Sequence, residues 1–187
     1  MTYEVRELGT AEREARIAEI LDLYQAVGWV NYTSRPAMVR AALTGSLAVW
    51  GAFAGERLVG FARVVGDGAS IVFLQDVVVA PELHRRGIGS ALVRAVLERF
   101  GGVYQMELLT DDGPGTCAFY ESLGFSRAER LGCVAYVRFV PAGWAAATPA
   151  GPHSRVRASS AGDCGHAGPG VRAPSRDMSR SAGARGA

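Results

Sequence analysis

The sequence predicts an α/β (mixed α+β) fold in which one mixed sheet is flanked by helices on both faces. Apolar residues change repeatedly between the two-residue period of strands and the longer period of helices. Short glycine-containing segments at 55–56 and 66–68 separate three strand-like stretches and predict antiparallel hairpins. A strand–helix–strand unit over residues 70–110 predicts a right-handed parallel crossover. Both kinds of pairing therefore belong to one sheet, which helices cover on two sides.

The amino-terminal segment is predicted to be a strand followed by a long helix. Tyr3 and Val5 alternate with polar neighbours over residues 2–8, as in a strand. Thr10 is expected to cap a helix that runs to about Val27, and Gly28 to end it. One face of this helix is apolar and carries Ile17, Ile20, Leu21 and Tyr24.

A loop and a second, shorter helix are predicted next. Pro36 suits the first turn of a helix, because N–H groups in that turn have no helical acceptor and the one that proline lacks is not needed. Val39 and Leu43 share one face, and Gly45 ends the segment. We therefore expect a short amphipathic helix that packs on the sheet.

The middle of the chain is predicted to hold three strands and the crossover helix. The strands cover 46–54, 57–65 and 70–79. The helix covers 88–100, stacks Ile88, Leu92 and Val96 on one face, and stops at two glycines.

The remaining elements complete the order β-α-α-β-β-β-α-β-α-β. We expect a strand over 104–110, a helix over 116–123 that Gly124 ends, and a strand over 132–140. The last strand has apolar residues on both faces, as in a buried strand. Together these elements make a domain of residues 1–140.

Residues 141–187 are predicted to be a disordered tail. Ala, Gly, Pro, Ser and Arg make up 37 of these 47 residues, so little apolar surface is available to offset the entropy of ordering. The alternative is a basic binding tail, but its Arg residues are dispersed.

Charge and composition exclude several classes of partner. The tail holds six Arg and two Asp, which leaves 14 Arg against 16 acidic residues in the domain and argues against nucleic acid. The sequence contains no stretch of about 18 apolar residues, so we expect no membrane span. The first residues lack an apolar signal core, so we expect a cytoplasmic protein. Three scattered Cys and three His predict reduced thiols and no metal site.

A basic, glycine-rich turn follows the third middle strand. His84, Arg85 and Arg86 precede Gly87, Ile88 and Gly89, where the crossover helix begins. Free N–H groups and the positive end of the dipole at a helix start attract phosphate groups. The pattern is neither that of a nucleotide-hydrolase P-loop nor a full Rossmann fingerprint. The turn therefore predicts a pyrophosphate site of another kind.

With the element order, this turn resembles the GNAT superfamily of acetyl-CoA-dependent N-acetyltransferases over residues 3–140. The family signature Q/R-x-x-G-x-G/A is matched at 84–89, with His84 in place of Gln or Arg. Residues 118–125, A-F-Y-E-S-L-G-F, look like the family's second signature, although Gly113 stands where members often have Asn. Residues 28–33 and 108–112 look similar to a branch that acetylates small amines.

The resemblance implies an acetyl-CoA site built largely from backbone. Val77 and Val79 would bind the pantetheine amides as if the cofactor were an added strand. The pyrophosphate would bind in the turn formed by His84, Arg85, Arg86, Gly87, Ile88, Gly89 and Ser90. The alternatives are a buried strand with ordinary pairing and a solvated basic loop.

The resemblance also implies an acid for acetyl transfer, whereas the base is less determined. A Tyr at the position of Tyr120 points its hydroxyl at the thioester sulfur in the family, and a phenol can donate a proton to a thiolate. Asp76, on the face shared with Leu74 and Val78, is the candidate base, directly or through water. The alternatives are aromatic core packing for Tyr120 and an acceptor contact or loop cap for Asp111 and Asp112.

The loop that contains Trp29 and Tyr32 lies where the family places its acceptor wall, and both rings could pack against an aromatic or aliphatic amine. The alternative is that they cover helix ends. We therefore expect direct acetyl transfer from acetyl-CoA to a primary amine of a small molecule, without metal, in a chain that could pair as a homodimer. A non-catalytic acyl-CoA sensor and a protein N-terminal acetyltransferase are the competing interpretations.

Overall fold

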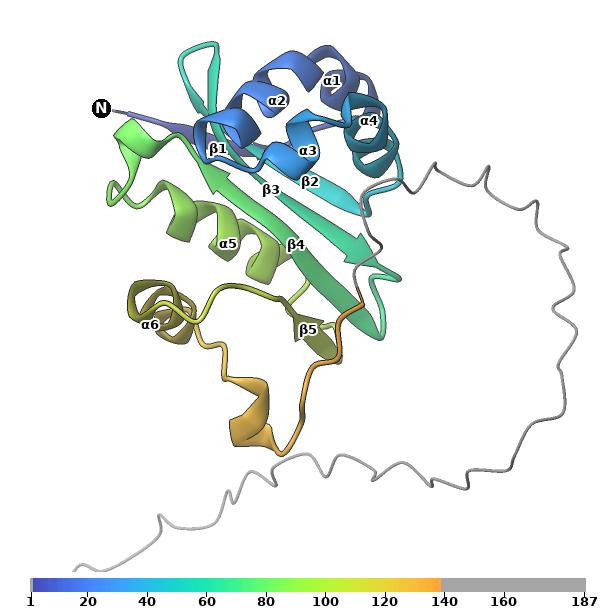
Figure 1. Ribbon diagram of the computed structural model, residues 1–187, viewed down its shortest axis with the longest axis vertical. Helices are drawn as coiled ribbons and strands as arrows, with labels where there is room; N and C mark the ends of the chain where they lie inside the picture. Colours follow the sequence, from blue (N-terminus) through green and yellow to red (C-terminus); the bar gives the residue numbers. More distant parts are fainter. Residues whose placement is uncertain (1, 139–187) are drawn as a thin grey trace, which may run out of the picture. The chain divides into compact units, whose positions relative to one another are not determined.

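A five-stranded mixed sheet in the order β1-β2-β3-β4-β5 organises residues 2–138, which are the residues that this computed structural model describes (Figure 1). Strands β1 to β4 pair antiparallel, and β5 joins β4 in parallel. The mixed sheet and the parallel crossover expected from the sequence are thus confirmed. The strands are β1 (Glu4–Glu7), β2 (Ala48–Ala54), β3 (Arg57–Gly66), β4 (Ile71–Val79) and β5 (Gln105–Glu107).

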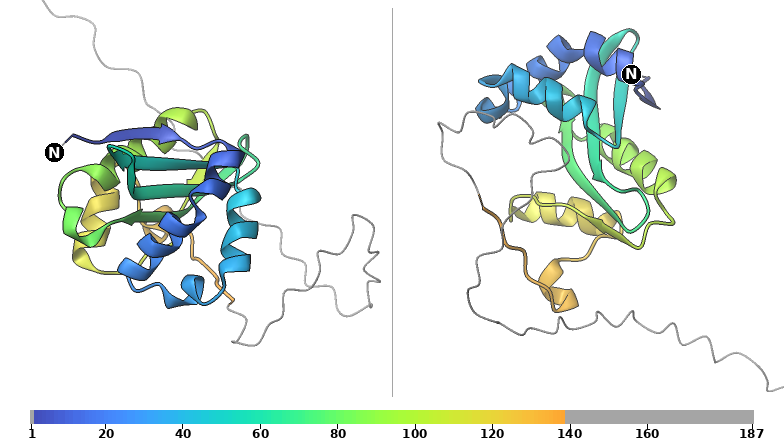
Figure 2. Two further views of the ribbon diagram at one scale, coloured as in Figure 1. Left: turned by 90° about the horizontal axis from the view of Figure 1, so that it is seen from above. Right: turned by 90° about the vertical axis from the view of Figure 1, so that its right-hand side faces the viewer.

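Helices cover both faces of the sheet (Figures 1 and 2). One face carries the first four helices, and α5 crosses the opposite face, with α6 next to its amino-terminal end. The helices are α1 (Thr10–Ala15), α2 (Ile17–Ala26), α3 (Val30–Thr33), α4 (Pro36–Thr44), α5 (Ile88–Arg99) and α6 (Pro114–Ser122). Two short 3-10 turns, η1 (Pro81–Leu83) and η2 (Ala128–Leu131), complete the described elements.

The core lies on both faces of the central strands. Nearly every residue of β2 and β3 is buried, as their apolar composition requires when helices cover both sides. Along β4 burial alternates, so that Leu74, Asp76 and Val78 face inward. From the opposite side, Leu92 and Val96 of α5 are fully buried against the sheet, which confirms the predicted apolar face of this helix.

The long amino-terminal helix of the prediction is interrupted. Thr10 is the first helical residue and Gly9 occupies the cap position, so the predicted Thr10 cap is wrong. Arg16 separates the two helices with φ −96° and ψ 8°, and its guanidinium donates to the Glu56 carbonyl in the β2–β3 turn at 2.8 Å. A further short helix, α3, occupies the expected loop. These departures depend on tertiary contacts that apolar periodicity does not report.

The predicted strand over 132–140 is also wrong where the structure describes it. Residues 132–138 are irregular and exposed, with Tyr136 at 93%. An apolar run becomes a strand only where a neighbouring strand pairs with it, and within residues 2–138 none does. Residues 139–140 and the predicted tail, 141–187, lie outside the described residues.

None of the helices described in residues 2–138 is both long enough and apolar enough to cross a membrane.

The β3–β4 turn is held by one carboxylate. Asp67 Oδ1 accepts the N–H groups of Ala69 at 2.8 Å, Ser70 at 2.7 Å and Ile71 at 3.0 Å. The Ser70 hydroxyl donates to Oδ2 at 2.5 Å. The Ser70 hydroxyl and the three amides hold the pKa of Asp67 far below its ordinary value, because all four bonds favour the ionised form.

We expect Asp67→Asn to lower the melting temperature by about 2–4 °C at pH 7, because the amide replaces a charged acceptor with a weaker one. A depressed pKa contributes stability above the unfolded value of about 4 and loses it as the pH falls further. The difference in melting temperature between wild type and variant should therefore shrink between pH 4 and pH 2.5 in calorimetry. A gap that stays constant over this range would contradict the assignment.

Candidate active site

Strands β4 and β5 separate after a short stretch of pairing. Their register ends at Phe73 opposite Glu107, so β4 from residue 74 onward has one edge without a partner strand among residues 2–138. On the other edge, the Ala80 N–H donates to the Val59 carbonyl at 2.9 Å. Because adjacent residues of a strand direct their backbone groups to opposite edges, Val77 and Val79 turn theirs toward the free edge. The backbone arrangement that the sequence analysis expected is present.

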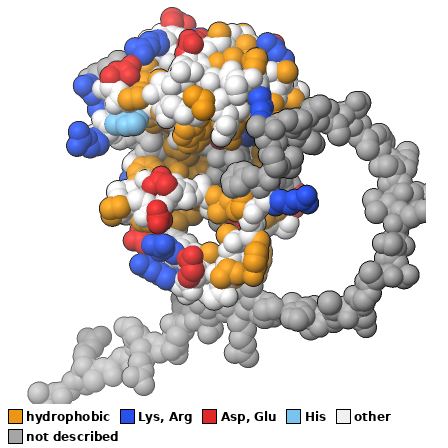
Figure 3. Space-filling view, viewed as in Figure 1, with side chains coloured by type: hydrophobic (Ala, Val, Ile, Leu, Met, Phe, Trp, Pro, Cys, Tyr) orange, Lys and Arg blue, Asp and Glu red, His pale blue; other side chains and the backbone are white. Residues whose placement is uncertain are grey.

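A cavity of about 700 Å³ lies along this free edge. Its walls are β4, the turn before α5, residues 109–111, one face of α6, and Val27 with Trp29. Apolar side chains gather in the hollow between the part that carries α1–α4 and the part that carries α6 (Figure 3). The separation of the two strands therefore opens a space that is large enough for a small-molecule ligand.

The turn before α5 presents a row of unpaired donors. Within the described residues, the N–H groups from Arg85 to Ser90 donate to no protein acceptor, and the first helical bond is made by Ala91. Arg85 and Gly87 have left-handed backbones, with φ of 60° and 83°. This conformation turns successive N–H groups to the same side, which is the arrangement that binds phosphate.

His84 ties the turn back to the strand. Its Nε2 lies 2.8 Å from the Val79 carbonyl oxygen, so the ring donates a hydrogen bond to this acceptor on the free edge. Val79 is left with its N–H group for a ligand, whereas Val77 keeps both backbone groups. His84, which departs from the family signature, thus forms a hydrogen bond with β4 in this structure.

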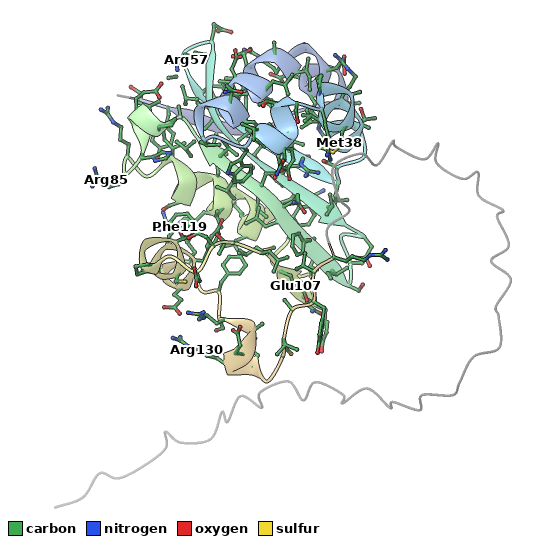
Figure 4. All side chains as sticks on the ribbon, in the orientation of Figure 1. Met38, Arg57, Arg85, Glu107, Phe119 and Arg130 are labelled. Atoms are coloured by element: carbon green, nitrogen blue, oxygen red, sulfur yellow. The ribbon has the colours of Figure 1, made fainter. Side chains whose placement is uncertain are left out.

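The two arginines of the turn differ in position. Arg85 lines the cavity, and Figure 4 shows its side chain projecting outward from the turn. Arg86 is exposed and lies outside the cavity lining. Arg85 is therefore the arginine of the pair that is placed to add charge beside the unpaired N–H groups.

Tyr120 on α6 lines the cavity and is also packed. Its ring contacts Phe119 and Phe125 at centroid distances of 4.9 and 5.9 Å, so this residue packs among aromatic side chains and also borders the cavity. Burial, and after it the charge of Asp111, raises the pKa of the Tyr120 phenol above its ordinary value of about 10. The hydroxyl is consequently protonated at neutral pH and can donate.

The two carboxylates before α6 have different surroundings. Asp111 lines the cavity, but its Oδ1 also accepts the Gly113 N–H at 2.9 Å, which makes it a loop cap. Asp112 is exposed and does not line the cavity. Of the two, Asp111 is the one that a ligand in the cavity could contact.

Asp76 lies in the core and does not line the cavity. Its side chain is 1% exposed, and its Oδ2 accepts bonds from Arg63 Nε at 2.5 Å and from the Tyr24 hydroxyl at 2.9 Å. The strand face was predicted correctly, but Leu74 and Val78 on that face line the cavity, whereas Asp76 does not. Direct proton transfer from an acceptor amine to Asp76 does not fit this placement, and transfer through water stays a prediction.

The aromatic residues of the acceptor loop are stacked on one another. Trp29 lines the cavity and lies 5.8 Å from the rings of both Tyr24 and Tyr32. Tyr32 stacks on Tyr24 at 4.4 Å and stands behind the lining. Trp29 is thus in position to touch a ligand, with Tyr32 behind it.

Some lining residues were not identified from the sequence, including Gln75, Leu109, Thr116 and Phe119. Gln75 shares the strand edge of Val77 and Val79, so the alternation that placed those valines could have placed it. Phe119, beside Tyr120, lies on the side of α6 that faces α5, and its ring would be 3.5 Å from a methyl group added to Gly89 (Figure 4). It narrows the cavity next to the turn.

Comparisons with known proteins agree on one family. Residues 45–127 match the family model described as an acetyltransferase (GNAT) domain. A solved GNAT-family acetyltransferase from Streptococcus pneumoniae is 36% identical, with a TM-score of 0.64 over 74% of this chain and 97% of that chain.

Two further relatives extend the comparison. An uncharacterised N-acetyltransferase (ycf52-like) of Prochlorococcus marinus is 33% identical over 120 residues, which are 61% of this chain and 64% of that protein's length. PaiA N-acetyltransferase from Thermoplasma acidophilum, solved in complex with coenzyme A, is 17% identical with a TM-score of 0.55 over 67% of this chain and 91% of that chain. At that identity it shows a shared fold.

Gly87→Ala should weaken coenzyme A binding about ten-fold and lower the free energy of unfolding by about 1 kcal/mol. The backbone φ of 83° is strained for any residue with a Cβ atom, and this atom would lie 3.3 Å from the Tyr3 hydroxyl, so we expect the turn to relax and to displace its N–H groups.

Gly55→Ala is the matched control, because Gly55 also has a positive φ, of 63°, but lies in the β2–β3 turn with nothing within 4 Å of the added atom. It should lose similar stability and keep its affinity for coenzyme A, measured by calorimetric titration. Equal losses of affinity in the two variants would show that the turn before α5 has no special role.

Proposed function

The chain belongs to the GNAT superfamily of acetyl-CoA-dependent N-acetyltransferases, and from that membership we propose that it transfers the acetyl group of acetyl-CoA directly to a primary amine of a small molecule. One observation carries the proposal: among residues 2–138, a row of unpaired N–H groups adjoins a strand edge without a partner strand, and Tyr120 lines the same cavity. Sites for phosphate, for peptide-like amides and for the leaving group would thereby border one cavity.

The residues present fit coenzyme A. The N–H groups from Arg85 to Ser90, with the Arg85 side chain, would hold the pyrophosphate. Val77 and the Val79 N–H would pair with the pantetheine amides as an edge strand pairs with an added one. Once bound, acetyl-CoA supplies the activated thioester, and the proposed direct transfer to the amine requires no metal.

In the transfer, an N–C bond forms at the acetyl carbonyl carbon and the C–S bond breaks. Tyr120 is proposed to donate its phenolic proton to the departing sulfur and to regain a proton from solvent. The attacking nitrogen must be neutral, although a free alkylamine titrates near pH ~10. Its proton leaves to water in the cavity or through water to Asp76; the pairing of Asp76 with Arg63 favours the first route.

The acceptor end of the cavity supports an amine on an apolar body. Trp29, Val27 and Leu109 contribute apolar lining there, and Asp111 is the acidic side chain among the described lining residues. A flat or aliphatic group can pack on the Trp29 ring while its amine stays near polar atoms. Tyr32 supports this wall from behind, and we assign no acceptor contact to Asp112.

Location and assembly follow the sequence-based expectations. We propose a cytoplasmic protein that forms homodimers. Cell fractionation tests the first statement, and light scattering of the purified chain tests the second.

Activity is tested by thiol release from acetyl-CoA with a panel of amines that covers arylalkylamines, polyamines, amino acids and aminoglycosides. We expect turnover with at least one primary amine, and coenzyme A at millimolar concentration should raise the melting temperature. Binding of coenzyme A without turnover of any amine would favour a sensor over an enzyme.

Tyr120→Phe should lower kcat about a hundred-fold and leave the dissociation constant of coenzyme A within about two-fold of wild type. The phenylalanine keeps the packing against Phe119 and Phe125 but has no proton to give. Tyr104→Phe, at a residue that is 73% exposed, is the control and should keep full activity.

The pH dependence provides a second check on Tyr120. Because its pKa is raised, the phenol stays protonated up to at least about pH 10, so Tyr120 should cause no loss of kcat below that pH. If Tyr120→Phe instead removed a loss of kcat between pH 7 and pH 9, the assignment would be wrong.

A further inference from the structure

We propose that the buried Asp76–Arg63 ion pair is a positioning unit. Through Tyr24 it holds the aromatic wall, which the rings of Trp29 and Tyr32 form at the acceptor end of the cavity. This inference rests on the proposed function for its kinetic consequences, because it concerns how the acceptor amine is oriented. In this proposal Asp76 does not contact the acceptor but positions the residues that do, and Tyr24 affects how well the acceptor binds.

The pair itself is fully enclosed. Arg63 on β3 is 6% exposed and Asp76 on β4 is 2% exposed, and Arg63 Nε lies 2.5 Å from Asp76 Oδ2. Arg63 Nη1 also reaches the Ser46 hydroxyl at 3.4 Å. Burial of two charges is expensive, and their attraction repays it when the geometry is good and further hydrogen bonds are made. Such a pair therefore fixes β3 and β4 with respect to each other.

The backbone around the pair is irregular. The register of β3 against β4 shifts between Arg63 and Val64, and Gln75 is the residue of β4 left without a partner. Asp76 keeps the alternation of β4 and is buried in the core beside this bulge, whereas its neighbour Gln75 lines the cavity.

A hydrogen bond extends the pair to the helices. The Tyr24 hydroxyl on α2 donates to Asp76 Oδ2 at 2.9 Å, and Tyr24 is 1% exposed. Its ring also meets Phe61 of β3 edge-to-face at 5.2 Å. The tyrosine thus has little freedom to rotate, because its hydroxyl and its ring are held by different strands.

The aromatic wall stacks on this fixed ring. Tyr32 lies parallel to Tyr24 at 4.4 Å with 14° between the planes, and Trp29 lies at 5.8 Å with 26°. The Trp29 N–H donates to the Tyr24 carbonyl at 2.9 Å. A continuous chain of contacts therefore runs from the ion pair through Tyr24 to Trp29 at the cavity.

A second contact joins the wall to β4, at the residue next to Asp76. Gln75 Nε2 donates to the Tyr32 hydroxyl at 3.5 Å, and among the described residues Asp76 Oδ1 is buried without a hydrogen-bond partner. The charge of Asp76 also contributes, after burial, to the raised pKa of Tyr32. Arg63, Tyr24 and Tyr32 are thus the titratable groups that face Asp76 from the surrounding elements.

Two roles for Asp76 make opposite predictions. As a base it would move protons during the chemical step, whereas as a positioning residue it would set how well the acceptor binds. The placement of the carboxylate favours positioning, since it is outside the cavity lining and is already bonded to two donors.

Tyr24→Phe is the primary test, because it removes the hydroxyl and keeps the stacked ring. We expect the KM of the acceptor to rise about five-fold while the KM of acetyl-CoA and kcat stay within about two-fold of wild type, as loss of one hydrogen bond to a charged group loosens the wall. Tyr104→Phe again serves as the control. An unchanged acceptor KM in Tyr24→Phe would overturn the proposal.

Hydrogen exchange provides a readout that does not depend on activity. The amides of Trp29, Tyr32 and Ser34 bond to carbonyls within residues 24–30 and should exchange at least about three-fold faster in Tyr24→Phe. The Phe100 amide at the end of α5 should be unaffected. If wild type acetylates no amine, the proposed function fails, and the exchange result still decides whether the pair holds the wall.

Asp76→Asn separates positioning from base catalysis. A positioning role predicts a higher acceptor KM with an unchanged shape of the pH profile of kcat/KM. Loss of kcat by about a hundred-fold or more, together with loss of the acidic limb of that profile, would establish Asp76 as the base.

The asparagine variant leaves Arg63 buried without its counter-charge and could fail to fold. The double variant Arg63→Met with Asp76→Leu removes both charges and keeps an apolar core, which proteins often tolerate. It should retain turnover with a raised acceptor KM, and loss of turnover in this folded variant would overturn the proposal.

Discussion

Backbone hydrogen bonding along β4 is the constraint from which the site follows. The strand is paired with β3 along nearly its whole length, but with β5 over three residues. Beyond Phe73, its outer edge carries polar groups that no described strand binds and that a cavity leaves accessible. Unpaired backbone groups seek partners, so a peptide-like ligand can complete what the sheet leaves open. Longer pairing with β5 would close the same edge and remove the cavity.

The turn before α5, which we propose as the phosphate site, also depends mainly on backbone groups. Arg85 and Gly87 adopt left-handed backbones, and the resulting row of N–H groups meets the positive end of the α5 dipole. The domain as a whole carries 14 Arg against 16 acidic residues, so attraction for an anion is local to the turn and not a property of the whole surface. His84 adds a hydrogen bond that joins this turn to Val79, and it thereby couples the two parts of the ligand site.

Specificity is expected to come from the other end of the cavity. There the wall consists of stacked rings. Among the contacts described, it reaches the sheet through Tyr24, which bonds to Asp76 and packs on Phe61, and through the hydrogen bond between Gln75 and Tyr32. A buried ion pair is weak evidence for stability but restricts geometry strongly, because both charges must keep their partners. The core thus carries polar atoms at the place where the orientation of an acceptor would be decided.

The sequence by itself determined the mixed sheet, the crossover, the turn at 84–90 and the candidate Tyr120, because periodicity, glycine turns and contiguous motifs are local properties. Only the tertiary structure decided that Asp76 faces Arg63 and Tyr24, that Arg16 interrupts the first helix, and that residues 132–138 pair with no described strand. Each of these depends on which residues, distant in the sequence, come into contact when the chain folds. Alternation along β4 identified the face of Asp76 correctly, but whether a given side chain on that face meets the cavity or a buried arginine is determined by the packing of other elements.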